Sequence, residues 1–448
     1  MKNSHPNGAI GRGMRMGRLG LHVVGSYLGY QLQNLLLGSE SREERHTKLR
    51  RNVSRRVREE LAELKGPLMK FGQILSMQTQ MLPDESIEEL SNLQMRAPGM
   101  HPTLARAQFK SSLGRYPEEV FREFEAEPFA AASLGQVHRA MTRSGEKVAV
   151  KIQYPAIRTA IENDFKLLRT ATLPGRMTGH LPVSILKEVQ RGFLEETDYI
   201  NEGRNIDFLR EALADLPYVT APKVYWDATT DRVLTMSYVD GLTIRDFLSR
   251  RPPQEVRNLI GQRLLEMFLF QIHCVHVVHA DPHPGNYFFN LEGHIGMVDF
   301  GCVKKYSADV SELSRCFIDR SWTNGEKQVQ RISRLLWGTP QFSRRAKTRE
   351  MLRSVSEFYD MVYPPPETRR SVVDFADPAL LGALTRNFQE AVRNKLCNAE
   401  FAFSSRAELG LYNLLHQLRS RVDTRRVWSG VVERLSETPI EPLPAQRR

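Results

Sequence analysis

Three polar residues in the stretch HADPHPGNYFFNLEGHIGMVDFG, at 279–301, have types and spacing that suit metal and phosphate chemistry. Asn286 follows Asp281 by five residues, and Asp299 comes after a short predicted hairpin and directly before Phe300-Gly301. In this order one carboxylate can face a reacting group, while the amide and the second carboxylate bind magnesium. Each piece alone arises by chance, but their order and separation together indicate a site for a metal-bound nucleoside triphosphate.

A site of this kind needs a cation for the phosphates, and Lys151 is the candidate. It ends the run VAVK at 148–151, where apolar neighbours alternate with it on a predicted strand and leave its ammonium on one face. An ordinary exposed strand lysine is the alternative, which the hairpin downstream makes the weaker of the two.

An acidic run, EETDYINE at 195–202, could supply the partner that such a lysine needs. We expect one long helix over 183–213, on which Asp198 and Glu202 share a face. A solvated helix face is the alternative interpretation. Apolar positions in the same helix indicate partial burial: Phe193, Ile200, Phe208 and Leu209.

The candidate nucleotide loop departs from the glycine-rich type. Kinases lay GxGxxG over the phosphates because glycine permits close backbone approach. This chain has Ala130, Ala131, Ala132, Ser133 and Leu134 before a single Gly135. Because alanine restricts the backbone, we expect this loop to hold a nucleotide in a stiffer pose.

Composition describes an ordinary globular protein with a basic surplus. The 448 residues are 41% hydrophobic and 26% charged, with a formal net charge of +11, which favours acidic partners such as lipid headgroups, nucleic acid or the nucleotide itself. The four cysteines form no CxxC spacing, so a zinc site or a disulfide framework is not expected. No signal peptide opens the chain, so secretion is not expected.

Residues 19–38 are uncharged and, on length alone, could cross a bilayer, for which roughly 20 apolar residues are needed. The segment contains His22, Gln31, Gln33 and Asn34, and its apolar residues recur at helical spacing. This pattern is typical of an amphipathic helix, flanked here by arginines. It could dock on its own domain or on an anionic membrane, and a true span is the least favoured choice.

Changes in pattern divide the chain into four predicted regions. Residues 1–60 form a basic amphipathic helical segment, 61–123 a helical extension, 124–240 an N-lobe with inserted helices, and 241–448 a helical C-lobe that carries the Asp281 hairpin. Strands are expected at 135–142, 147–153, 219–226 and 232–238. The prolines at 364–366 should separate the last helices from the body of the C-lobe.

The motifs together resemble a known family. KFGQ at 70–73, AAASLGQVHRA at 130–140, VAVK, EETDY with Glu202 four residues after its aspartate, HADPHPGN and DFG occur in the order of the UbiB family of atypical kinases, also called aarF-domain or ADCK-type kinases. The resemblance covers about residues 60–305.

This resemblance implies an α+β, bilobal protein-kinase-like fold with a family-specific N-terminal helical extension that covers the place of a protein substrate. It also implies ATP and Mg²⁺ as cofactors. Lys70 and Gln73 would reach the active site from the extension, where Lys70 would meet Glu196 and Asp198. Glu202 would pair with Lys151, Asp281 would be the catalytic base, and Asn286 and Asp299 would hold the metal. His279 would be the structural histidine, whereas His283 and Pro284 are family hallmarks to which the sequence assigns no chemistry.

The sequence therefore predicts a magnesium-dependent ATPase or atypical kinase that acts in ubiquinone or other isoprenoid-lipid metabolism, by resemblance. A serine/threonine protein kinase and a non-catalytic nucleotide- or lipid-binding scaffold are the alternatives. Expected partners are ATP, an anionic membrane surface or isoprenoid lipid, and quinone-biosynthesis proteins, but not nucleic acid, because the arginines at 42–58 lack interleaved aromatic residues. We expect a cytoplasmic protein, peripheral at the inner membrane; the sequence specifies no oligomeric state.

Overall fold

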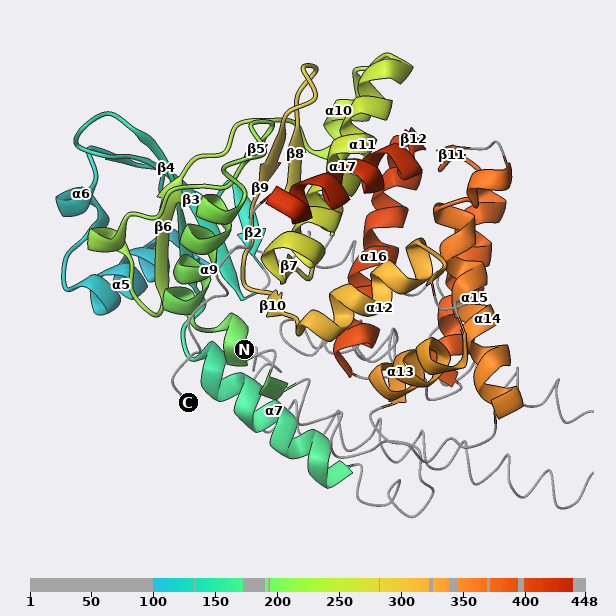
Figure 1. Cartoon of the computed structure of the whole chain (residues 1–448). Coiled ribbons are helices and arrows are strands. Elements are labelled where there is room, and N and C mark those ends of the chain that lie inside the picture. The colour runs from blue at the N-terminus through green and yellow to red at the C-terminus, as the bar shows by residue number, and fades with distance from the viewer. Residues whose placement is uncertain are drawn as a thin grey trace, which may run out of the picture. The chain divides into compact units, whose positions relative to one another are not determined.

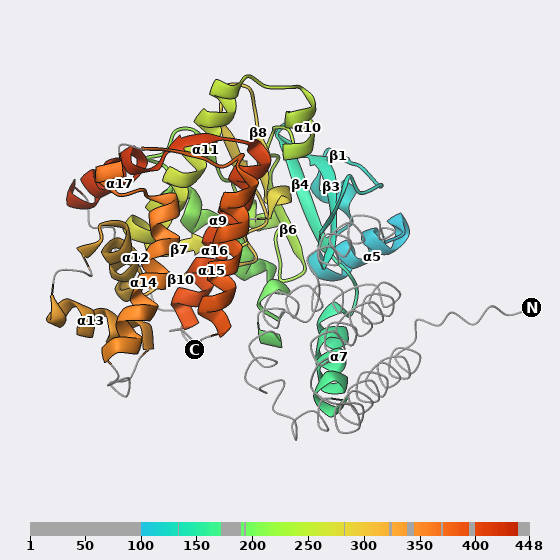
Figure 2. The same cartoon turned by 90° about the vertical axis from the view of Figure 1, so that its right-hand side faces the viewer.

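The computed structural model describes residues 100–132, 134–171, 190–191, 194–281, 283–321, 325–337, 345–368, 371–393 and 399–437. The chain forms two compact units (Figures 1 and 2). The first contains the described residues up to Gly203 together with Val224–Tyr238. The second contains Arg204–Lys223 and the described residues from Val239 onward. The predicted extension, including Lys70 and Gln73, and the segment 19–38 lie outside the described residues.

An antiparallel sheet is the framework of the first unit (Figure 1). Its order is β1-β3-β4-β6, with β2 paired to β3. The strands are β1 (Glu123–Phe124), β2 (Ala130–Ala132), β3 (Gly135–Met141), β4 (Lys147–Gln153) and β6 (Val233–Ser237). Gly145, at φ 89°, allows the tight turn from β3 to β4. The strands predicted at 135–142 and 147–153 are thus confirmed.

A helix covers this sheet and closes a small core. The described helical segments here are α5 (Pro102–Leu113), α6 (Pro117–Val120), α7 (Ile157–Ala171) and a 3-10 turn (Trp226–Ala228). Helix α5 begins at a proline behind His101, whose Nδ1 accepts from the amide of Thr103, and ends before Gly114 in the left-handed conformation. Its Phe109 is fully buried in a cluster with Phe121 and the sheet residues Val148, Val150 and Val233.

The single helix predicted over 183–213 is wrong in its described part. Residues 194–196 are helical, the chain then turns at Thr197, and α9 (Tyr199–Ala212) begins afresh. Thr197 Oγ1 donates to the carbonyl of Leu194 at 2.7 Å, and the Thr197 carbonyl accepts from Gln153 Nε2 at 2.9 Å. These two hydrogen bonds hold Thr197 in a non-helical conformation and so end the helix. The periodicity of apolar residues does not predict such bonds.

The strand predicted over 219–226 is also largely wrong. Only β5 (Val219–Thr220) is a strand, and it pairs in parallel with β9 (Ile295–Met297) of the second unit instead of joining the first sheet. Val224 makes an isolated bridge with Met236. A short apolar run gives no information about which partner strand it will meet.

The second unit is mainly helical. Its described helices are α10 (Ile244–Ser249), α11 (Gln254–Phe270), α12 (Ala308–Ile318), α13 (Glu326–Trp337), α14 (Arg345–Val362), α15 (Pro378–Arg393), α16 (Ala399–Leu418) and α17 (Thr424–Glu437). Its other strands are β7 (Val277–His279), β8 (Tyr287–Phe289), β10 (Val303–Lys305), β11 (Val372–Asp374) and β12 (Arg421–Asp423). Strand β9 lies between β5 and β8, β7 pairs with β10, and β11 with β12.

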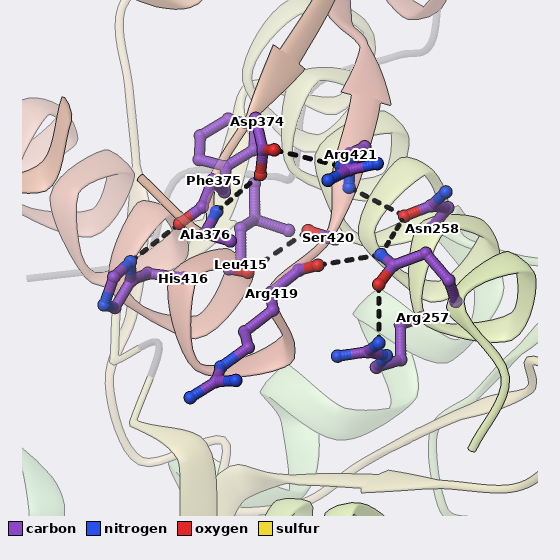
Figure 3. A network of polar contacts seen from close by, with 11 residues as sticks. Arg257, Asn258, Asp374, Phe375, Ala376, Leu415, His416, Arg419, Ser420 and Arg421 are labelled. Atoms are coloured by element: carbon purple, nitrogen blue, oxygen red, sulfur yellow. Dashed lines mark hydrogen bonds and ion pairs between the residues drawn. The ribbon is translucent and has the colours of Figure 1, made fainter. Parts of the chain in front are cut away.

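Helix α11 organises this unit, because α16, α17 and β12 all contact it. Gly261 allows the closest approach: a Cβ there would lie 2.5 Å from the Cβ of Ser420, which is fully buried. Polar bonds fix the same junction (Figure 3). Gln254 Nε2 donates to the carbonyl of Arg419 at 2.8 Å, and the amide of Arg421 donates to Asn258 Oδ1 at 2.8 Å.

The sequence predicted that the three prolines at 364–366 separate the last helices from the body of the C-lobe. This prediction is wrong. Arg425, at the start of α17, donates to the carbonyls of Ile318, Tyr363 and Pro364, each at 2.8 Å. One guanidinium therefore ties the end of α12, the end of α14 and the proline run together. In the described part of the chain, no helix is long and apolar enough to cross a membrane.

A buried carboxyl group lies between α14 and α16. Glu408 is 4% exposed; its Oε1 accepts from the hydroxyl of Tyr412, and its Oε2 from that of Tyr359 at 3.4 Å. Burial raises the pKa of Glu408 to about 7 from an ordinary value of 4.5, and the two hydrogen bonds oppose this shift only in part. The carboxyl group is therefore held mainly in its neutral form below neutral pH.

We expect Glu408 to make the protein less stable as the pH rises. Between pH 4.5 and 7 the folded state binds the proton that the unfolded state releases, so the free energy of unfolding falls across this window, by up to about 3 kcal/mol. Glu408→Gln stays neutral and should gain stability relative to the original protein between pH 5 and pH 8, measured by urea unfolding. The exposed Glu357→Gln on α14 is the control; an equal pH response of both variants would contradict the assignment.

Candidate functional site

A buried hydrogen bond to the preceding helical turn holds the strand that leads to Asp281. Helix α11 continues into a π-helical turn, Gln271–Val275, and Gln271 Oε1 accepts from the amide of His279 at 2.8 Å. Strand β7 pairs with β10, and the amide of Ala280 donates to the carbonyl of Cys302 at 2.8 Å. Irregular helical turns of this type are frequent at functional sites. Asp281 therefore follows a segment whose backbone is held on two sides.

Asp281 and Asn286 contact each other directly. Asn286 Nδ2 donates to the carbonyl of Asp281 at 2.9 Å and to its Oδ2 at 3.2 Å. Asn286 is 8% exposed, and its carbonyl accepts from the amide of Val298 at 3.0 Å. Because the amide nitrogen of the side chain is used as a donor toward Asp281, the oxygen Oδ1 is the end left to coordinate a cation.

His283 and Pro284 shape the turn between these two residues. The 3-10 turn Pro284–Asn286 begins with proline, and His283 Nδ1 accepts from the amide of Gly285 at 3.0 Å. The amide of Asn286 donates to the His283 carbonyl at 2.9 Å. The structure thus gives these two residues a role in positioning Asn286, which the sequence did not supply.

Asp299 follows β9 with a left-handed backbone, φ 61°, an uncommon conformation for a residue other than glycine. Its carbonyl accepts from His279 Nε2 at 2.8 Å, which places the imidazole hydrogen on that nitrogen. The next residue, Phe300, is fully buried, and its ring meets that of His279 edge-on at 5.4 Å. His279 is therefore a structural residue that links the Asp281 strand to the Asp299 turn.

The donor set fits a magnesium site of the phosphate-bridged type. No group of three or more His, Cys, Asp or Glu side chains suited to a metal ion occurs among the described residues. Magnesium in nucleotide sites usually has one or two protein carboxylate ligands and takes the rest from phosphates and water. Asp299 together with the Asn286 oxygen matches that requirement. These two residues are too few to enclose a metal ion with protein ligands alone.

Lys151 and Glu202 form a buried ion pair within the first unit. Lys151 Nζ lies 2.8 Å from Oε1 and 2.9 Å from Oε2 of Glu202, and the two side chains are 9% and 2% exposed. The ammonium also lies 5.0 Å from the ring centre of Tyr199, within cation–π range. The acidic run thus provides a carboxylate that holds Lys151, as expected of a phosphate-anchoring lysine.

The alanine-rich segment is a tight hairpin and not an open loop. Ala132 pairs with Gly135 across the turn from β2 to β3, and Ala130 and Ala131 are exposed. A Cβ on Gly135 would lie 2.3 Å from the carbonyl oxygen of Ile152, so glycine is required here by packing against β4. Ser133 lies outside the described residues. The stiffer nucleotide pose expected from the alanines stays a prediction.

Two further acidic candidates differ in their surroundings. Asp198 caps α9: its Oδ1 accepts from the amides of Ile200 and Asn201, each at 3.1 Å. Glu196 is half-buried in the preceding helical turn. Their proposed contact with Lys70 involves a residue outside the described part of the chain, so it stays a prediction.

Sequence reasoning missed two residues that support the site, Gln271 and Asn205. Gln271 interrupts the apolar run after Phe268, and a buried glutamine in such a run is a signal that its side chain has a specific partner. Asn205 lies one turn after Glu202 on α9, and its Nδ2 donates to the carbonyl of Phe300 at 3.0 Å. No sequence motif marks the contact with Phe300, because the two residues are distant in the chain.

The Lys151–Glu202 pair leads to a stability prediction. Lys151→Met removes the lysine and leaves a buried carboxylate behind, so we expect a loss of about 3–5 kcal/mol in the free energy of unfolding. The double variant Lys151→Met/Glu202→Leu removes both charges and should recover most of that loss. Urea unfolding followed by circular dichroism measures both; equal destabilisation of the single and double variants would show that the charge is not the cause.

Several known proteins are similar to this chain in sequence. The family model for the ABC1 atypical kinase-like domain matches residues 92–333. Protein ACTIVITY OF BC1 COMPLEX KINASE 7 of Arabidopsis thaliana is 32% identical over 71% of this chain and 46% of its own length. A probable protein kinase UbiB of Pseudomonas aeruginosa is 31% identical over 61% of this chain and 56% of its own length. The chain thus spans about half the length of these curated relatives.

A solved structure gives the same fold. Rv3197 of Mycobacterium tuberculosis, in its complex with erythromycin, superposes with a TM-score of 0.58 at 25% identity, over 88% of this chain and 98% of that one. The α+β kinase-like fold expected from the sequence is therefore confirmed. Lys151, Glu202, Asp281, Asn286 and Asp299 all lie inside the matched region, which is more than half of the sequence. The chain belongs to the ABC1 atypical kinase-like family, which includes the UbiB and ADCK-type proteins.

Proposed function

We propose that this protein is a magnesium-dependent atypical kinase or ATPase that uses ATP. The observation that carries the proposal is the pair Asp281–Asn286: the double donation from Asn286 Nδ2 orients its oxygen for a cation and holds the carboxylate next to it. A non-catalytic scaffold has no need of this arrangement. The buried Lys151–Glu202 pair and the family membership support the same conclusion.

In the proposed mechanism the residues position groups and neutralise charge. Lys151, held by Glu202, would bind nucleotide phosphates through its ammonium. Asn286 and Asp299 would hold magnesium, which supplies charge neutralisation at the phosphates when bound. Asp281 Oδ1 or Oδ2 would accept a hydrogen bond from the attacking hydroxyl or water and orient it.

The biological setting is part of the proposal. By their resemblance to the UbiB family, the motifs favour a role in ubiquinone or other isoprenoid-lipid metabolism, with a lipid or a small hydroxyl compound as acceptor. The net charge of +11 favours contact with an anionic membrane surface. Lys70 and Gln73 would complete the site from the N-terminal extension.

Removal of the metal ligand should abolish metal-dependent binding. Asp299→Asn keeps the size of the side chain and removes the charge that attracts magnesium, so we expect ATP affinity to lose its dependence on magnesium. Titration of ATP with and without EDTA measures this. Glu357→Gln, an exposed carboxylate on α14, is the matched control; equal magnesium dependence of Asp299→Asn and the original protein would sink the metal assignment.

Removal of the base should separate binding from turnover. Asp281→Ala should bind magnesium-ATP with little change while phosphate release falls by about 10²–10⁴-fold, the usual contribution of a general base. Phosphate release is measured with and without vesicles containing anionic lipid. Release that vesicles stimulate and the variant lacks supports a membrane-linked enzyme; no phosphate release by the original protein under any condition would favour the scaffold.

A further inference from the structure

Asn205 makes a contact that the known motifs do not explain. Its side chain is half-buried on α9, and Nδ2 donates to the carbonyl of Phe300 at 3.0 Å, directly after Asp299. The bond joins residues 95 positions apart in sequence. A lysine or arginine at this position on α9 could also donate to the carbonyl, but it would place a positive charge beside Asp299. The neutral amide of asparagine donates without adding a charge.

The backbone at Asp299 is one of the positions in the second unit that need such support, because its φ of 61° is left-handed. A left-handed residue other than glycine costs free energy and persists where its surroundings hold it. His279 Nε2 donates to the carbonyl of Asp299 at 2.8 Å, and the amide of Ala280 donates to the carbonyl of Cys302 at 2.8 Å. Both donors come from the Asp281 strand, whereas Asn205 comes from a separate element, α9.

Helix α9 carries two relevant side chains in consecutive turns. Glu202 pairs with Lys151, and Asn205 bonds Phe300. Helix α9 is continuous from Tyr199 to Ala212, so both side chains extend from the same helix. Asn205 is therefore placed to relate the orientation of this helix to the conformation of the Asp299 turn.

We propose that Asn205 is a positioning residue for Asp299: its amide holds the Phe300 carbonyl and thereby keeps the Asp299 carboxylate in the orientation that binds magnesium. This inference rests on the proposed function, since it assumes that Asp299 is a metal ligand. It adds a residue from α9 to those that determine the strength of the magnesium site.

Three variants test the proposal. Asn205→Ala removes the donor, and Asn205→Asp keeps the shape of the side chain but places a carboxylate against the Phe300 carbonyl. Arg210→Ala, five residues later on α9 and exposed, is the control. ATP affinity is measured by calorimetry in magnesium and in EDTA, with thermal unfolding of each variant as a check on folding.

We expect Asn205→Ala to weaken binding of magnesium-ATP by about five- to tenfold, the effect of one lost hydrogen bond, with affinity in EDTA unchanged within about twofold. Asn205→Asp should be weaker still, and Arg210→Ala should match the original protein. A folded Asn205→Ala protein with full magnesium dependence would overturn the proposal, because a merely structural residue would alter stability and not the metal response.

Hydrogen exchange of the protein without nucleotide provides a second readout. Amides at 300–302 should exchange at least about tenfold faster in Asn205→Ala than in Arg210→Ala, because the turn loses an anchor. Equal exchange in the two variants would refute the role of Asn205 in holding the turn. If the original protein shows no magnesium-dependent ATP binding, the proposed function fails, and this exchange experiment decides separately whether Asn205 holds the turn.

Discussion

The left-handed backbone of Asp299 is the constraint on which the organisation of the candidate site in the second unit depends. A residue with a Cβ adopts this conformation only where neighbouring groups compensate its cost. Here the imidazole of His279 and the amide of Asn205 bind successive carbonyls, while the buried Phe300 ring anchors the turn in the core. The π-helical turn, β7 and β10 can be understood as the support that brings His279 to this place.

In the first unit the corresponding constraint is a buried pair of opposite charges. Lys151 and Glu202 are both almost inaccessible to water, so each needs the other, and the pair aligns β4 with the start of α9. The carboxyl group of Glu408 shows the opposite solution for a buried acid. Its partners among the described residues are tyrosine hydroxyls, and its raised pKa favours the neutral form.

Several unusual features of the first 300 residues have local structural causes. The alanine hairpin, the histidine that caps the turn before Asn286 and the break before α9 all depart from an ordinary kinase-like pattern, and each has a local structural cause in this chain. Gly135 is required by the carbonyl of Ile152, and His283 by the amide of Gly285. These departures are therefore explained by packing and hydrogen bonding within this chain.

The sequence by itself determined the strands at β3 and β4, and its motifs, through their resemblance to a known family, indicated the family, the α+β kinase-like class and the pairing of Lys151 with Glu202. These follow from local alternation and from motifs whose spacing is set by a few adjacent elements. Tertiary structure alone decided the break before α9, the parallel partner of β5 and the Asn205 contact. Each depends on a hydrogen-bond partner far away in the chain, such as Gln153 for Thr197, and neither periodicity nor propensity carries information about such a partner.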